Sequence, residues 1–131
     1  MESLNERIQH FKGEIDRWAE TILRTPNVDF AVLEQILNLG ADELNGLDAS
    51  RAASFAYLLS QYALSVQHET NRQRAFLGWA RKIRPHTLNE DRNRLIGMTM
   101  ATDYRIERLA DVGRRIESMS YAMQLVAKTR A

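Results

Sequence analysis

The chain has 131 residues, of which 44% are hydrophobic and 27% are charged, with two prolines, six glycines and no cysteine. This length fits one domain or one elongated module, and the lack of cysteine excludes disulfides, thiolate zinc sites and thiol catalysis. Met1 leads directly into a charged segment and no apolar run reaches the length of a membrane span. We therefore expect a cytoplasmic protein without membrane contact, located in the host cytoplasm if the protein comes from a phage.

Charge is distributed unevenly along the chain. Residues 1–48 contain four Lys or Arg against ten Asp or Glu, whereas residues 49–131 contain fourteen against seven. We divide the chain accordingly into an acidic segment, 1–48, and a basic segment, 49–131, within one structural unit. The split indicates separate partners for the two segments, subunits that meet acidic end to basic end, or two differently solvated faces of one globule.

The acidic segment is predicted to form two or three short helices. Apolar residues at spacings of three and four define one helical stripe from Leu4 to about Leu23. Thr25-Pro26 ends this helix, and a second is expected from Val28 to Leu39, opened by Pro26 or Asn27. Gly40 stands where a C-terminal capping glycine belongs, and residues 41–47 add one more turn. The residues of the first stripe are Leu4, Ile8, Phe11, Ile15, Trp18 and Ile22.

The basic segment predicts a long antiparallel helical hairpin. One arm runs from Ala49 to Arg84, with Asp48 as its N-cap, and the other runs from Thr87 to the C-terminus. Pro85 ends the first arm, and Thr87 with Glu90 has the pattern of a capping box. In the first arm the seam residues are Ala52, Phe55, Leu59, Tyr62, Val66, Glu69, Gln73, Phe76, Ala80 and Ile83. In the second arm they are Leu95, Thr99, Thr102, Ile106, Leu109, Val112, Ile116, Met119, Met123 and Val126.

The middle of the first arm, residues 67–74, is almost entirely polar. It indicates either a buried polar layer that fixes the register of the arms or subunits, or a solvated stretch where the hairpin splays. Two arms bury only one stripe each, so we expect a homo-oligomer that resembles a helical bundle. Apolar residues off the seam are the expected subunit contacts: Leu58, Leu77, Tyr104, Tyr121 and Leu125.

No motif indicates an enzyme. His68-Glu69 begins like the zinc-protease motif H-E-x-x-H, but Arg72 stands where the second histidine is needed. The glycines are isolated, and the serines lack a nucleophile elbow. We expect no catalytic residue, no metal, no cofactor and no small-molecule substrate.

Basic residues concentrate around the predicted turn. Between Gln67 and Gly97 there are seven of them against three acidic residues, and six of the seven are arginine, which suits bidentate phosphate contact. This pattern predicts nucleic-acid binding, with a solvated face as the alternative. Trp79 either stacks on an unpaired base or packs on the N-terminal helices, whereas Phe76 belongs to the seam. The predicted contacts are Arg72, Arg74, Arg81, Lys82, Arg84, Arg92 and Arg94.

The hairpin also carries a recognisable pattern over roughly residues 55–127. Its first arm has Leu59-x-x-Tyr62, Glu69, Arg72 and Trp79, and after a charged turn its second arm has Thr102-Asp103, Leu109, Ile116 and Ala122-Met123. In length, helix layout and pattern the chain resembles the UvsY-type recombination mediators of phages. Members of that family are homo-oligomeric accessory factors that bind single-stranded DNA and help to load a recombinase past a single-strand-binding protein.

The resemblance implies the same role here, with single-stranded DNA and a recombinase or single-strand-binding protein as partners. The DNA contacts it implies are Arg72, Arg74, Arg81, Lys82 and Arg84. Two features depart from the family: residues 1–48 have no match, and arginine dominates where lysine is commoner. We therefore expect a non-enzymatic oligomeric accessory protein of phage type. The alternative is a helical interaction module without nucleic-acid binding, such as a virion subunit, an adaptor or an inhibitor of a host complex.

Overall fold

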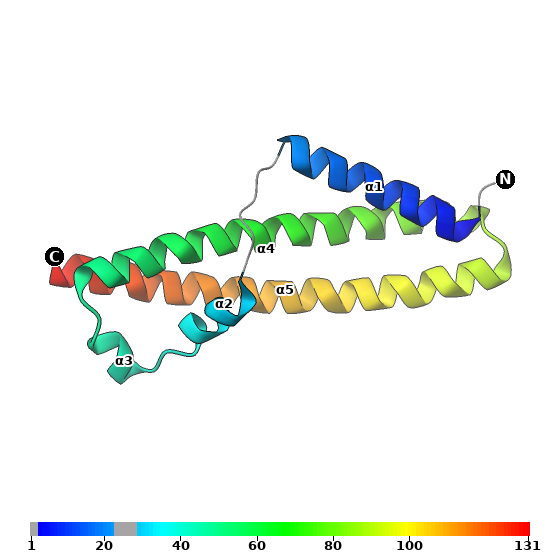
Figure 1. The fold of residues 1–131 in the computed structure, drawn as a ribbon. Helices are drawn as coiled ribbons and strands as arrows, with labels where there is room; N and C mark the ends of the chain where they lie inside the picture. The colour runs from blue at the N-terminus through cyan, green and yellow to red at the C-terminus, as the bar shows by residue number, and fades with distance from the viewer. Residues whose placement is uncertain (1–2, 23–28) are drawn as a thin grey trace. The chain divides into compact units, whose positions relative to one another are not determined.

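A computed structural model of the chain describes residues 3–22 and 29–131, with side chains described everywhere in those ranges except at residues 18–22. All regular secondary structure in the described ranges is helical, which confirms the predicted all-α class. The elements are α1 (Leu4–Ile22), α2 (Phe30–Leu37), α3 (Ala41–Asn45), α4 (Ala49–Ile83), the 3-10 turn η1 (Arg84–His86) and α5 (Asn89–Arg130) (Figure 1). None of the described helices is long and apolar enough to cross a membrane.

The two long helices, α4 with 35 residues and α5 with 42, pack against each other as a helical hairpin, as predicted. At 1.5 Å per residue they measure about 52 and 63 Å. Their seam positions are buried or half-buried, so the three-and-four spacing of the sequence identified the packed faces correctly. The most completely buried large side chains of the seam are Leu59, Leu95, Thr102, Ile116 and Met123.

The starts of α1, α3 and α4 follow the sequence prediction, whereas α2 begins at Phe30 rather than Val28. Asp48 caps α4 by accepting a hydrogen bond from the Arg51 amide at 2.7 Å. Asp29 caps α2 in the same way, whereas the predicted openers of this helix lie outside the described residues. Gly40 is not a left-handed C-cap: its φ of −83° is negative, and it precedes α3 as N-cap, with its amide donating to Glu43. The prediction failed because α3 begins immediately after Gly40.

The turn between the long helices also differs from the prediction. The Thr87 hydroxyl donates to the Arg84 carbonyl at 2.7 Å instead of capping α5, so the expected capping box does not form. Helix α5 begins two residues later, where the Arg92 amide donates to the Leu88 carbonyl at 2.8 Å. The physical reason is Pro85, which favours the short 3-10 turn η1, where the Arg84 carbonyl accepts from both the amide and the hydroxyl of Thr87.

The chain divides into two compact units, and both contain parts of the acidic and basic segments. Unit 1 combines residues 1–24 with Glu69–Leu109, and unit 2 combines Thr25–His68 with Ala110–Ala131. Each unit therefore contains a portion of α4 and a portion of α5, together with short N-terminal helices.

In unit 1, α1 packs on the C-terminal part of α4 and the N-terminal part of α5 (Figure 1). Phe11, Trp79 and Met98 lie half-buried against the core that the three helices form. The buried members of this core are Leu4, Ile8, Phe76, Ala80, Ile83 and Leu95.

In unit 2, α2 and the segment after α3 contribute to the buried interior. Arg115 of α5 donates to the Asn38 side chain at 3.2 Å and lies 3.7 Å from the Glu34 carboxylate, and Arg130 donates to the Leu47 carbonyl. The buried apolar residues of unit 2 are Leu33, Ile36, Leu37, Leu47, Ala52, Leu59, Tyr62, Val66, Ile116 and Met123.

The polar stretch of α4 is partly enclosed: Gln67, Asn71, Arg72 and Arg74 are exposed, and the other four residues are buried or half-buried. Thr70 is buried there, as are Thr99 and Thr102 on α5, while Glu69 and Gln73 are half-buried. The hydroxyls of Thr99 and Thr102 donate to carbonyls of their own helix at 2.8 Å, so their burial leaves no unsatisfied donor. Polar residues therefore lie in the seam, and their role in fixing the register of the arms stays a prediction, since these hydroxyls bond within α5.

Candidate nucleic-acid interface

All seven basic residues predicted to contact nucleic acid lie in unit 1, on the last turns of α4, on η1 and on the first turns of α5. Some of these side chains form ion pairs or hydrogen bonds with other residues of unit 1, and others are exposed to solvent. The seven residues are Arg72, Arg74, Arg81, Lys82, Arg84, Arg92 and Arg94.

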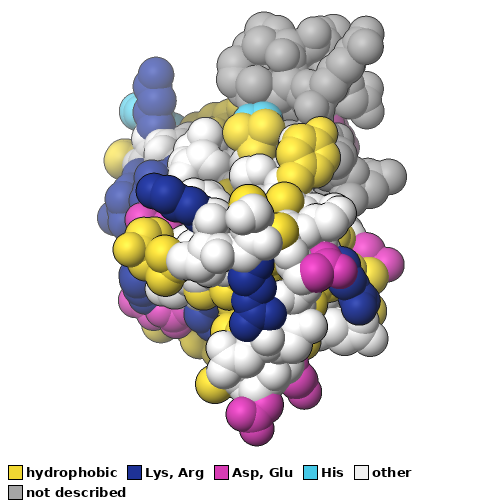
Figure 2. All heavy atoms as spheres, turned by 90° about the vertical axis from the view of Figure 1, so that its left-hand side faces the viewer, with side chains coloured by type: hydrophobic (Ala, Val, Ile, Leu, Met, Phe, Trp, Pro, Cys, Tyr) yellow, Lys and Arg dark blue, Asp and Glu magenta, His cyan; other side chains and the backbone are white. Residues whose placement is uncertain are grey.

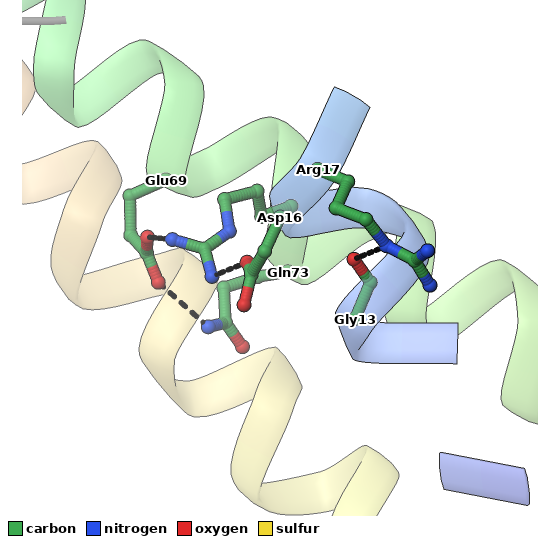
Figure 3. A network of polar contacts seen from close by, with 6 residues as sticks. Gly13, Asp16, Arg17, Glu69 and Gln73 are labelled. Atoms are coloured by element: carbon green, nitrogen blue, oxygen red, sulfur yellow. Dashed lines mark hydrogen bonds and ion pairs between the residues drawn. The ribbon is translucent and has the colours of Figure 1, made fainter. Parts of the chain in front are cut away.

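Arg72 is engaged by two carboxylates of unit 1. Its guanidinium forms an ion pair with Asp16 of α1 and another, at 3.2 Å, with Glu69 one turn earlier on α4. Glu69 also accepts a hydrogen bond from Gln73 at 2.9 Å. Figure 3 shows Asp16 reaching from α1 to the place where Glu69 and Gln73 lie on α4. Arg72 therefore ties α1 to α4, and its charge is already compensated.

The two predicted contact residues on α5, Arg92 and Arg94, also have partners within unit 1. Arg94 donates to the Asn5 side chain of α1 at 2.7 Å. Arg92 is half-buried and donates to the Thr87 carbonyl at 3.2 Å, where it braces the turn. Its buried Nε has no hydrogen-bond partner among the described residues. Both arginines thus have structural roles, which weakens their assignment to the interface.

Arg74, Lys82 and Arg84 differ from the paired arginines described above in both exposure and contacts. All three are exposed, and their side chains form no ion pair or hydrogen bond with any residue in the described ranges. Arg81 is similar to them: its charged partner among the described residues, Asp103, lies 4.0 Å away, and both side chains are more than half exposed. A pair of this kind adds little to stability and leaves the guanidinium accessible.

Three of these cations stand on the last turns of α4, and Arg84 follows them in η1. Arg74 and Arg81 are seven residues apart, so they lie on one helical face about 10 Å from each other, with Lys82 beside Arg81. Phe76, Ala80 and Ile83 on the opposite side point into the core of unit 1. Packing of the apolar face therefore directs the four cations outward, and we call them the cationic face: Arg74, Arg81, Lys82 and Arg84.

Trp79 does not belong to this face. Its ring stacks on Phe11 of α1, with centroids 5.0 Å apart and an interplanar angle of 17°. The centroid of the Trp79 ring also lies 5.8 Å from that of the Phe76 ring, which is tilted against it. The alternative interpretation of Trp79, packing on an N-terminal helix, is therefore confirmed, and this packing weakens the hypothesis that the ring stacks on a base. The cause is the packing of α1 on this part of α4, which places Phe11 over the indole.

The residues expected to form subunit contacts differ in how far they are exposed. Tyr104, Tyr121 and Leu125 are exposed by half or more of their surface, whereas Leu58 is half-buried. Leu77 is only 8% exposed because it packs within unit 1, so it cannot serve as an open contact surface. The sequence analysis missed further exposed apolar residues: Tyr57, Leu64 and Met100, on the side of the helices away from the seam, and Ile96 at the flank of the seam.

A cavity of about 270 Å³ lies in unit 1 among α1, α4 and α5. Its polar lining includes Lys12, Asp16, Arg72 and Arg105. Arg105 was not predicted, because it lies outside the basic window and only the fold brings it to the same cavity as Arg72. Within this lining the Asp16 carboxylate pairs with Arg72. Among the described residues, no cluster of three His, Cys, Asp or Glu side chains could hold a metal ion.

Comparison with protein-family models, with curated proteins and with solved structures gives no match to this chain. The resemblance to recombination mediators therefore stays a prediction, and functional inference depends on the geometry of unit 1.

Proposed function

We propose that the chain binds nucleic acid through the cationic face, as a non-enzymatic accessory protein. The observation that carries this proposal is the set of three exposed cations, Arg74, Lys82 and Arg84, that have no partner within the described part of the chain, with Arg81 held only weakly. Four cations at a helix end supply a local positive field, and three of them are arginines suited to phosphate oxygens.

The contacts in this proposal are made to phosphates and carry no base readout. Arg74 and Arg81 lie about 10 Å apart along α4, which lets them contact different phosphates of one strand. The packed position of Trp79 removes the one aromatic residue that could have stacked on a base from this face. Single-stranded DNA is the ligand that the family resemblance implies, together with assistance to recombination or replication.

The test is a titration of labelled single-stranded and duplex oligonucleotides at several salt concentrations. With three to four phosphate contacts, affinity for the single strand is expected to fall roughly 20- to 50-fold between 50 and 200 mM salt. The variant Arg74→Glu/Lys82→Glu should bind far more weakly than the wild type at every salt concentration.

A matched control is Arg51→Glu/Lys128→Glu, which changes net charge by the same amount. Both residues are exposed in unit 2, and neither side chain has a partner within the described ranges. If this control weakened binding as much as the variant at Arg74 and Lys82, the interaction would depend on overall charge rather than on the cationic face. Absence of binding at low salt would refute the proposal outright.

The second candidate function is a helical interaction module without nucleic acid. It is favoured by the exposed apolar residues of α4 and α5, among them Tyr57, Met100 and Tyr121, each about two-thirds exposed. Figure 2 shows hydrophobic side chains interspersed with basic and acidic ones on the face that it presents, a surface able to meet another protein. Protein that purifies free of nucleic acid, judged by absorbance at 260 and 280 nm, and captures one defined protein would support this candidate.

A further inference from the structure

We propose that the cavity of unit 1 binds a small organic monoanion with an apolar body, of the aryl carboxylate class. The cavity has a volume of about 270 Å³, close to the lower end of the range of small-molecule pockets, which begins at roughly 300 Å³. Residues of α1, α4 and α5 line it, so no local sequence pattern predicts the site. No residue of the cationic face lies in this lining, and the inference is therefore independent of nucleic-acid binding.

Most of the inner lining of the cavity is apolar. Among the described lining side chains that are buried or half-buried, the apolar ones are Phe11, Ile15, Phe76 and Met98. The polar ones are Gln73 and Thr102, and both already donate hydrogen bonds within unit 1. The inner part of the cavity therefore offers contact mainly to an apolar body.

The inner lining and the volume suit an aromatic ring. The rings of Phe11 and Phe76 are tilted to each other, with centroids 6.5 Å apart, and the Met98 thioether lies in the same lining. Tilted aromatic rings and thioether sulfur both make favourable contacts with a further ring. An apolar cavity of about 150 Å³ is large enough for benzene. The cavity of unit 1 is larger, so it has room for a ring with a charged substituent.

The exposed part of the lining contains cations without a carboxylate partner. Arg105 forms no ion pair or hydrogen bond with any residue of the described ranges. The Lys12 ammonium lies 5.6 Å from the centroid of the Phe76 ring and is likewise unpaired with any described carboxylate. A guanidinium presents parallel N–H groups that match the two oxygens of a carboxylate. Arg105 is therefore the expected carboxylate contact, and Lys12 adds a second positive charge.

The charge balance of the lining favours a single negative charge on the ligand. Arg72, the third cation of the described lining, already pairs with Asp16 in the lining and with Glu69 outside it (Figure 3). Three cations against these two carboxylates leave one positive charge in excess. A carboxylate monoanion neutralises that excess, whereas a phosphate dianion goes beyond it.

Naphthoate is the probe for this site, because it joins one carboxylate to an aromatic body. Titration calorimetry with the full chain should show saturable binding at one site per chain. Naphthamide has the same rings without the charge, and acetate has the charge without the rings. Each should bind at least about tenfold more weakly than naphthoate, since each lacks one of the two contacts. Naphthamide binding as tight as that of naphthoate, or no saturable naphthoate binding, would overturn the proposal.

Arg105→Gln tests the carboxylate contact. It should weaken naphthoate binding about tenfold, the loss expected for one hydrogen-bonded contact to a charged group. The matched control is Arg74→Gln, which removes the same charge from another exposed arginine of unit 1 that lies outside the lining. Equal weakening by both substitutions would mean that net charge alone attracts naphthoate, and the assignment of the site would be wrong.

Ala101→Leu tests the cavity without a change of charge. Ala101 is an exposed residue of the lining, and leucine is nearly as good a helix former as alanine, so α5 accommodates the substitution. A helical circular dichroism spectrum with unchanged Tm verifies the fold. The larger side chain should abolish naphthoate binding, whereas Ala53→Leu, at an exposed position of α4 in unit 2, should leave it unchanged. Naphthoate binding that survives Ala101→Leu would locate the ligand elsewhere and refute the proposal.

Discussion

Arg72 and Arg74 are two residues apart on α4, yet the structure gives them opposite roles. Arg72 pairs with Asp16 and Glu69, whereas Arg74 is exposed and has no partner in the described ranges. Replacing each by glutamine removes the same charge from nearly the same place. The two variants should therefore separate a structural arginine from a binding arginine.

The magnitudes follow from exposure and pairing. The partners of Arg72 are about half exposed, and such pairs each contribute about 0.2–1 kcal/mol, so Arg72→Gln should cost about 1 kcal/mol of unfolding free energy. For a chain of this length that lowers Tm by about 3–4 °C. Arg74→Gln should change stability by less than about 0.5 kcal/mol. Losing one phosphate contact should nevertheless weaken single-stranded DNA binding about fivefold at 0.1 M salt.

Thermal unfolding followed by circular dichroism and oligonucleotide titration measure the two effects on the same samples. A double-mutant cycle with Asp16→Asn isolates the coupling between α1 and α4, and this coupling should decrease at 1 M salt because the pair is half exposed. The reasoning would be refuted if Arg74→Gln lowered Tm more than Arg72→Gln. It would also be refuted if Arg72→Gln weakened DNA binding as much as Arg74→Gln without any loss of stability.

Three further predictions concern the fold and the tryptophan. Leu95→Ala should destabilise the protein by about 2–5 kcal/mol in urea unfolding, since Leu95 is fully buried, whereas Leu88→Ala, at an 80% exposed position, should have almost no effect. Asp48→Ala should cost about 1 kcal/mol by removing the N-cap of α4, and Asp48→Asn should retain most of that stability in the same thermal assay. In a Trp18→Phe background, the emission of Trp79 should stay unchanged when oligonucleotide is added, because the ring is covered by α1; strong quenching would show that it meets bases.

The hairpin was predictable because its determinants are local. Residues three and four apart on a helix share one face whatever the rest of the chain does, so the spacing from Ala52 to Ile83 identified the buried side of α4. The cap at Asp48 likewise depends on a contact within three residues. Local patterns failed only where two of them competed, as at Thr87, whose hydroxyl bonds to the carbonyl exposed by the η1 turn rather than to the start of α5.

For the candidate interface, the sequence predicted only that basic residues concentrate near the turn. A run of arginines can be counted in the sequence, but the sequence does not show which of them are already paired. Asp16 reaches Arg72 across 56 residues, and Phe11 covers Trp79 from another helix. These contacts exist because α1 packs on one side of α4 rather than another, a choice that hydrophobic periodicity leaves open.

The sequence by itself thus determined the helices, their buried faces and the cluster of positive charge near the turn, since each depends on neighbours within about one or two helical turns. The tertiary structure decided which charges stay free, which aromatic rings are covered and which apolar residues remain exposed. Those outcomes depend on the pairing of helices distant in sequence, and in unit 1 that pairing leaves Arg74, Lys82 and Arg84 in solvent while it encloses Trp79 and Leu77.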